Sequence, residues 1–200
     1  MKEPFVKFIE SELGSGFLLI ACGLPATAKT GVAEEISKIK GHPLLCSDLI
    51  RLEVLKNEDI FDEKIASNMD KRIMVYDEMF RQADESLNNG DGVILDATFI
   101  IQSLRRRAAA IAAKHNLNFV ILQTDCPQEV AIRRIWERTK ENYESSALTE
   151  QAYLNNKERF EQVDLNDLKD LYPDLSITHL IVDTRQDFPE NWYIIGVDKK

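Results

Sequence analysis

A doubly wound α/β domain, with a mainly parallel five-stranded sheet and helices on both faces, is the fold class that the sequence predicts. Five short apolar runs have strand length and do not alternate with polar residues, which is typical of parallel strands buried on both faces. Helical patterns separate these runs, and regular alternation of strand and helix favours an α/β sandwich. The runs are GFLLIAC from Gly16, HPLLCSD from His42, GVILDAT from Gly92, NFVILQTD from Asn118 and THLIVDT from Thr178.

Helices are predicted where apolar residues recur at three- and four-residue steps. They cover about 29–41, 70–88 and 103–115, and a short amphipathic helix is expected within 1–16. A long charged helical region runs over 127–162, and the sequence ESSALT supplies a break and a new cap inside it.

The chain of 200 residues suits one domain with one substantial core. We expect a single domain over 1–200, in which about 127–160 forms a helical lid. The segment 191–198 is predicted to form a last strand, antiparallel or at an edge, and 167–176 a loop.

Composition limits the class of partner and the compartment. With 34 acidic and 25 basic residues the formal charge is −9, which argues against extended nucleic-acid binding but leaves room for a small phosphorylated substrate. No apolar run approaches the roughly 20 residues of a membrane helix. The three cysteines lack CxxC spacing, so neither a disulfide framework nor a zinc site is indicated. We expect a reduced, cytoplasmic protein without a membrane partner.

The stretch CGLPATAKTG from Cys22 is one residue away from a phosphate-binding loop, or P-loop. It follows a predicted strand and opens a predicted helix, and its backbone N–H groups can bind phosphate oxygens. Lys29 adds a positive charge, and the hydroxyl of Thr30 can ligate Mg²⁺; the alternative is an ordinary turn with a chance lysine. The expected nucleotide-binding residues are Gly23, Leu24, Pro25, Ala26, Thr27, Ala28, Lys29, Thr30 and Gly31.

Ala28 departs from the pattern, which has a second glycine at this position. Its methyl group is expected to crowd the phosphate. If the backbone needs a positive φ there, the cost is roughly 1–2 kcal/mol. We expect a weakened loop rather than an abolished one.

Acidic residues end two further strands. Asp96 closes VILD, where it is expected to organise Mg²⁺ beside Thr30 on the face at which open α/β sheets bind ligands. Asp48 follows LLCS and is placed to accept a proton from an attacking hydroxyl, with Arg51 one helical turn on to hold the acceptor. The alternative for Asp48 is a helix N-cap.

Two groups of arginines are candidates for phosphate contacts. Arg134 and Arg138 are four apart and share a helix face, where they can stabilise charge in phosphoryl transfer, whereas Arg133 faces another way. The alternative is an exposed helix with pairs to its own glutamates. The run 105–107, RRR, is interpreted mainly as solvated surface.

The chain resembles the P-loop kinases of the AAA-like ATP-binding group, relatives of polynucleotide 5′-kinase, zeta toxins and chloramphenicol phosphotransferase. The resemblance spans about Phe17 to Thr184. It is carried by CGLPATAKT, LLCSDLIR, VYDEMFRQADESLNNGDGVILDATF, RRRAAAIAAKH, IRRIWER and SSALTEQAYLNNKERFE, followed by HLIVDT.

This resemblance implies a P-loop NTPase fold that moves the γ-phosphoryl group of ATP to a hydroxyl, with Mg²⁺. It implies that Asp48 is the base, that Arg51 contacts the acceptor, and that Arg134 and Arg138 are the lid arginines. Lys29 and Thr30 match the P-loop positions.

The leading hypothesis is therefore an ATP-dependent kinase for a small molecule or a nucleic-acid end. A nucleotide-binding regulatory module or pseudokinase is the alternative that Ala28 favours, and an NTP hydrolase would need the same residues. The acceptor, the choice of ATP or GTP and the oligomeric state stay open in the sequence.

Overall fold

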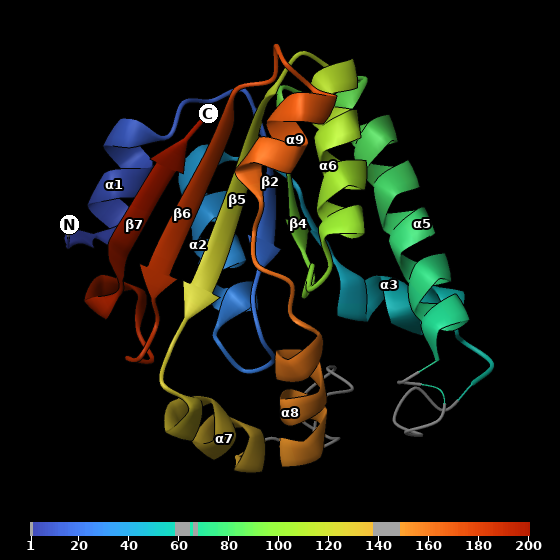
Figure 1. Ribbon diagram of the computed structural model, residues 1–200, viewed down its shortest axis with the longest axis vertical. Helices are drawn as coiled ribbons and strands as arrows, with labels where there is room; N and C mark the ends of the chain where they lie inside the picture. The colour runs from blue at the N-terminus through green and yellow to red at the C-terminus, as the bar shows by residue number, and fades with distance from the viewer. Residues whose placement is uncertain (1, 59–64, 66–67, 138–148) are drawn as a thin grey trace.

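A computed structural model describes residues 2–58, 65, 68–137 and 149–200. One twisted sheet runs through this part of the chain (Figure 1). Its strands are β1 (Glu3–Pro4), β2 (Phe17–Cys22), β3 (Leu44–Cys46), β4 (Gly92–Asp96), β5 (Asn118–Asp125), β6 (Ile177–Asp183) and β7 (Tyr193–Lys199).

The strand order is β1-β7-β6-β5-β2-β4-β3. The five strands from β6 to β3 are parallel and coincide with the five predicted apolar runs, which confirms the fold class. The predicted last strand is β7, antiparallel to β6. In the described residues the sheet thus has seven strands rather than five: β7 adds the predicted last strand, and the unpredicted two-residue β1 pairs outside β7.

The helices agree with the sequence pattern except near residue 167. They are α1 (Phe5–Glu12), α2 (Lys29–Lys40), α3 (Ser47–Val54), α5 (Met69–Leu87), α6 (Gln102–Lys114), α7 (Gln128–Trp136), α8 (Glu150–Arg159) and α9 (Leu165–Leu171), with a 3₁₀ turn η1 (Pro189–Asn191). The predicted loop over 167–176 was wrong in its first half. There the carboxylate of Asp164 caps α9 by accepting from two backbone N–H groups, and Leu165 and Leu168 are buried.

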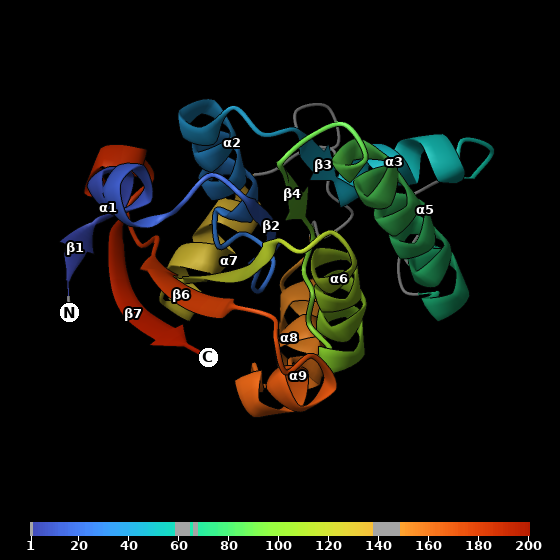
Figure 2. The ribbon, with the colours of Figure 1, turned by 90° about the horizontal axis from the view of Figure 1, so that it is seen from above.

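Helices cover both faces of the sheet, as Figure 2 shows from above. Alternate residues of β2 belong to two hydrophobic cores, one on each face of the sheet. Leu18 and Ile20 belong to the core with α5, α6 and α9, whereas Phe17 and Leu19 belong to the core with α1 and α2. All six residues of β2 are buried, as the unbroken apolar run predicts. This strand is therefore a rigid support for the loop that follows it.

The helices α7 and α8 lie beyond the carboxyl ends of the strands (Figure 1). They share a small apolar cluster in which Ile132, Ile135 and Tyr153 pack around Ala26. The Thr149 hydroxyl accepts from the N–H of Ala152 at 3.1 Å, so the predicted cap of α8 is present. Arg138 falls within 138–148, outside the described residues.

Cys22, Cys46 and Cys126 are free thiols. Across the described ranges, the helices are all too short or too polar to cross a membrane.

Candidate functional site

The site lies where the parallel strands end. β2 leads into the loop from Gly23, β4 ends at Asp96, and β3 ends at Cys46 directly before α3. The register pairs Ala21 with Asp96 and Cys46 with Asp96, so β4 brings its terminal carboxylate between the other two strands. This is the edge at which open α/β sheets bind ligands.

Left-handed backbone shapes the loop. Gly23 has φ of +144°, and a Cβ there would lie 2.6 Å from the hydroxyl oxygen of Thr124, so this position excludes every other residue. Ala26 and Ala28 have φ of 62° and 61°. Ala28 thus adopts the conformation for which the P-loop pattern uses glycine, and the loop keeps its shape at the cost of strain.

Thr98, Thr124 and Thr184, which are not among the predicted site residues, hold the loop in place. The Thr27 and Thr124 hydroxyls are 2.6 Å apart, and the Thr184 hydroxyl donates to the carbonyl of Thr27 at 2.9 Å. The Gly23 N–H donates to the carbonyl of Thr98 at 3.1 Å. Each of these three threonines closely follows or ends a strand. In the sequence, the signal that could have identified these residues is a hydroxyl side chain at the end of an apolar run.

Helix α2 begins directly at the end of the loop. Lys29 is its first residue, and its Nζ donates to the carbonyl of Leu24 at 2.7 Å. The N–H of Val32 donates to the carbonyl of Ala28 at 3.0 Å, which joins the first turn of α2 to the loop. N–H groups at a helix start lack partners within the helix, which makes them ready donors for an anion. Gly31 has a packing role as well, because a Cβ there would lie 3.2 Å from the Trp192 ring.

Thr30 and Asp96 meet across the site. The Thr30 hydroxyl donates to Asp96 Oδ2 at 2.6 Å, and the Asp96 side chain is 3% exposed. Burial raises the pKa of this carboxyl, although nearby Lys29 and the Thr30 hydrogen bond oppose the rise.

The two oxygens fit Mg²⁺, which prefers hard oxygen ligands, needs few protein ligands and keeps several waters beside substrate phosphates. Among the described residues no group of three or more His, Cys, Asp or Glu side chains could hold a metal. Thr30 and Asp96 would share the ion with phosphate oxygens and water.

Asp48 lies beside this pair. α3 begins at Ser47 with Cys46 as its N-cap, so the alternative in which Asp48 is the N-cap is wrong. The Cys46 thiol is 3.6 Å from Asp96 Oδ2, and burial together with the charges of Asp96 and Asp48 raises its pKa to about 12. The structure thus brings Asp48 and Asp96 close to the same half-buried thiol at the sheet edge.

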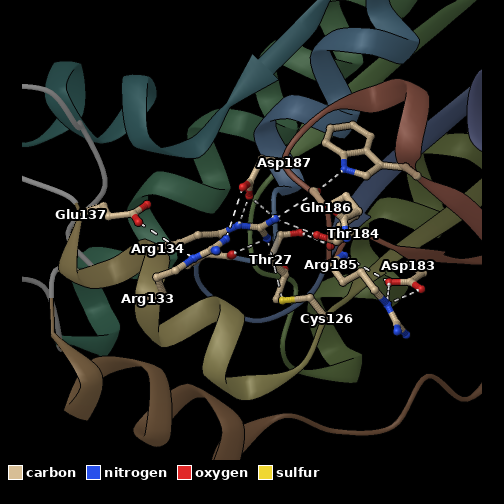
Figure 3. Close-up of polar contacts among 12 residues, drawn as sticks. Thr27, Cys126, Arg133, Arg134, Glu137, Asp183, Thr184, Arg185, Gln186 and Asp187 are labelled. Carbon is tan, nitrogen blue, oxygen red and sulfur yellow. Dashed lines mark hydrogen bonds and ion pairs between the residues drawn. The ribbon is translucent and has the colours of Figure 1, made fainter.

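Arg134 occupies a dense network at the edge of the loop (Figure 3). Its guanidinium donates to the carbonyls of Thr184 at 2.8 Å and Gln186 at 3.1 Å, and pairs with the Asp187 carboxylate at 2.7 Å. It also donates to the carbonyl of Ala26 at 3.3 Å, and its side chain is 13% exposed. Arg134 therefore joins α7 to the loop and to the segment after β6.

Arg133 shares Asp187 with Arg134 at 3.3 Å but is 52% exposed, as the helix register predicts. It also lies 3.9 Å from Glu137, one of the pairs expected for an exposed helix.

The arginine run at 105–107 was predicted to be solvated surface, and this is wrong for its first residue. Arg105 is fully buried, and its guanidinium donates to backbone carbonyls of Phe99, Glu161 and Gln162. Arg106 and Arg107 pair on the surface with Asp167 and Asp77, as expected. Arg105 can be buried because two of its acceptor carbonyls come from a segment about 55 residues further along the chain. A local sequence pattern does not reveal such distant partners.

Comparison with known proteins gives the same fold. The chain is similar to a gluconokinase from Sinorhizobium meliloti 1021, with 21% identity, a TM-score of 0.57, and coverage of 86% of this chain and 84% of that one. It is similar to a sugar kinase from Janibacter sp. HTCC2649, with 18% identity, a TM-score of 0.60 and coverage of 88% and 89%. Kti12 from Chaetomium thermophilum, solved with ADP-AlF₃, shares 20% identity at a TM-score of 0.54, over 74% of this chain and 81% of that one.

These identities establish the fold alone. A sequence match to a whole family goes further, because residues 18–163 match the AAA domain family. The matched range contains the loop, Asp48, Asp96 and Arg134, and it covers more than half of the chain. The chain therefore belongs to the AAA domain family and has its P-loop kinase-like fold.

Proposed function

We propose that this protein transfers the γ-phosphoryl group of ATP to a hydroxyl group of a small molecule or a nucleic-acid end. The observation that carries the proposal is the convergence of Lys29, the hydrogen-bonded pair Thr30 and Asp96, and Asp48 at one edge of the sheet. The gluconokinase and the sugar kinase are similar to this chain over most of their length, which favours a small acceptor.

The loop Gly23–Gly31 binds the phosphates through backbone N–H groups and the ammonium of Lys29. For this, Lys29 exchanges the carbonyl of Leu24 for phosphate oxygens. Thr30 and Asp96 hold Mg²⁺, which when bound neutralises charge on the phosphate oxygens. Ala28 already has the left-handed backbone conformation of the glycine that it replaces, which supports a working loop.

Asp48 acts as the general base. Its carboxylate accepts the proton of the acceptor hydroxyl while that oxygen bonds to the γ-phosphorus. The bond from this phosphorus to the bridging oxygen breaks, and ADP leaves with the electron pair. Arg51, one helical turn beyond Asp48, holds the acceptor.

We assign α7 and α8 to the lid predicted over about 127–160, from which Arg134 stabilises the transferring group. Arg138 is proposed for the same role and lies outside the described residues. Arg134 is anchored beside the loop at Ala26 and Asp187. In this proposal the contacts of Arg134 fix the position of α7 relative to the bound nucleotide.

The test is transfer of labelled γ-phosphate from ATP to a panel of sugars, sugar acids, nucleosides and oligonucleotides. Asp48→Asn should lower kcat by at least 100-fold with ATP affinity unchanged. Asp70→Asn is the matched control, because Asp70 is the first-turn acidic residue of α5. ATP hydrolysis without transfer would identify a hydrolase instead, and ATP binding without turnover a regulatory module.

A further inference from the structure

Arg51 is a buried cation with unused donors. Its residue is 8% exposed, and its Nε and Nη1 atoms have no hydrogen-bond partner. Buried polar atoms in proteins almost always have partners, and an unpaired buried charge is costly. An anionic group such as a carboxylate or a phosphate would supply acceptors for these donors and the charge that the buried guanidinium lacks.

Two more arginines converge on the same place. α3 packs against α5 (Figure 1), which carries Arg72. The Arg72 guanidinium donates to Asn156 on α8 at 3.4 Å. Arg159 is the last residue of α8, one turn beyond Asn156. Burial lowers the pKa of Arg72, and the positive charges of Arg51 and Arg159 lower it further, so Arg72 lies within electrostatic range of both.

The three arginines carry no counter-charge in the part of the chain that the structure describes. The ion pairs there involve other residues, and several surface arginines such as Arg81, Arg106 and Arg107 do have carboxylate partners. The net charge of the chain is −9, and Asp48 lies one turn before Arg51 on α3, yet within the described residues none of the three arginines forms an ion pair. Their mutual repulsion is relieved if an anion binds between them.

This arginine cluster, Arg51, Arg72 and Arg159, is placed toward the acceptor side of the site. Arg51 is three residues beyond Asp48 on the same helix, so about 4.5 Å separates them along its axis. The phosphates of ATP are bound on α2 in our proposal, on the other side of β4. An anion at the cluster is therefore a part of the acceptor.

We propose that the arginine cluster binds an anionic group of the acceptor, so that the substrate is a hydroxyl compound carrying a carboxylate or a phosphate. The assignment of this anion to an acceptor rests on the function proposed above. The anion site itself does not, because it follows from the convergence of three arginines and the two unpartnered nitrogens of Arg51.

The first test uses inorganic sulfate as the probe. Lys29→Ala protein is titrated in the presence of an ATP analogue and Mg²⁺, so that the P-loop contributes little, and bound sulfate is measured by equilibrium dialysis. One sulfate per chain is expected, with affinity at least 10-fold lower in Arg51→Gln and in Arg72→Gln. Arg81→Gln, an exposed residue of α5 that pairs with Glu78 and Glu85, should change nothing.

Arg159→Gln keeps the test valid if the buried variants fail to fold, because Arg159 is exposed at a helix end. It should also weaken sulfate binding severalfold. No sulfate binding, or binding that is equal in all variants, would overturn the anion site.

The second test compares acceptors with one carbon skeleton: a neutral sugar, its sugar acid and its sugar phosphate. We expect kcat/KM for one of the anionic compounds to exceed that for the neutral one by at least 100-fold. Arg51→Gln should reduce this ratio at least 10-fold, and the two anionic compounds separate carboxylate from phosphate. Equal rates on neutral and anionic compounds would refute the substrate class. Sulfate binding with no acceptor phosphorylated would refute the kinase proposal and leave the anion site standing.

Discussion

The hydroxyl of Thr30 donates to the carboxylate of Asp96 at 2.6 Å, although 66 residues separate them in the chain. The contact exists because β2 and β4 are neighbouring parallel strands whose carboxyl ends lie together. A helix start and a strand end thus present two oxygens at one point, beside the ammonium of Lys29.

Asp96→Asn should abolish most of the effect of Mg²⁺ on nucleotide affinity, because the amide lacks the charge that holds the ion. We expect affinity for an ATP analogue to rise at least 10-fold with Mg²⁺ in the unmodified protein and less than 3-fold in the variant, by calorimetric titration with Mg²⁺ or EDTA. Asp125→Asn, at the end of β5, is the matched control. A variant that keeps the full effect of Mg²⁺ would remove Asp96 from the metal site.

Ala28→Gly should stabilise the protein by up to about 1 kcal/mol, because glycine adopts φ near +60° without the methyl clash. The gain is smaller than the full strain because glycine is more flexible in the unfolded chain. Affinity for ATP should also rise. Denaturant unfolding measures the first effect.

Ala33→Gly is the control for that substitution. Ala33 lies inside α2 and is buried, so glycine there should destabilise by about 1 kcal/mol or more. Opposite signs at the two positions are the expected result. A loss of stability in Ala28→Gly similar to that in Ala33→Gly would contradict the account of the strained loop.

Arg134→Ala should destabilise the protein by about 1–3 kcal/mol, because the charged guanidinium donates to two carbonyls and pairs with Asp187. Arg133→Ala on the same helix, 52% exposed and sharing the same carboxylate, should change stability by less than about 0.5 kcal/mol. Thermal unfolding of both variants checks this difference. Equal effects would mean that the network around Arg134 does not hold α7 to the loop.

His179 should make the protein less stable in acid. It is buried on β6 beside Gln123, and burial lowers its pKa more than the nearby Asp198 carboxylate raises it. The unfolded chain therefore binds a proton below about pH 6.5 that the folded chain takes up only at lower pH, so stability falls as pH falls through this range.

His179→Gln removes this titration and keeps a polar side chain beside Gln123. The loss of unfolding free energy between pH 7.5 and 5.5 should be smaller in the variant than in the unmodified protein. An identical loss in both would show that His179 is not the responsible group.

The parallel core could be predicted because its physical signal is local. Strands buried on both faces are unbroken apolar runs, as in β2 and β4, and the carboxyl ends of parallel strands must lie together. The meeting of Thr30 with Asp96 follows from that geometry.

Other features depend on contacts between distant segments. The two residues of β1 are too few for a pattern, and α9 is specified mainly by the cap at Asp164. Arg105 is buried because carbonyls near residue 161 satisfy it, and the arginine cluster requires α3, α5 and α8 to be placed in space. Sequence spacing contains none of this information.

We propose that the loop with Ala28 in place of glycine is a working nucleotide site. Calorimetric titration with ATP and Mg²⁺ tests it most directly, on the unmodified protein, Lys29→Ala and the control Lys38→Ala, whose residue is 73% exposed on α2. We expect Mg²⁺-dependent binding that is at least 10-fold weaker in Lys29→Ala and unchanged in Lys38→Ala. Absence of Mg²⁺-dependent binding to the unmodified protein at millimolar ATP would contradict it.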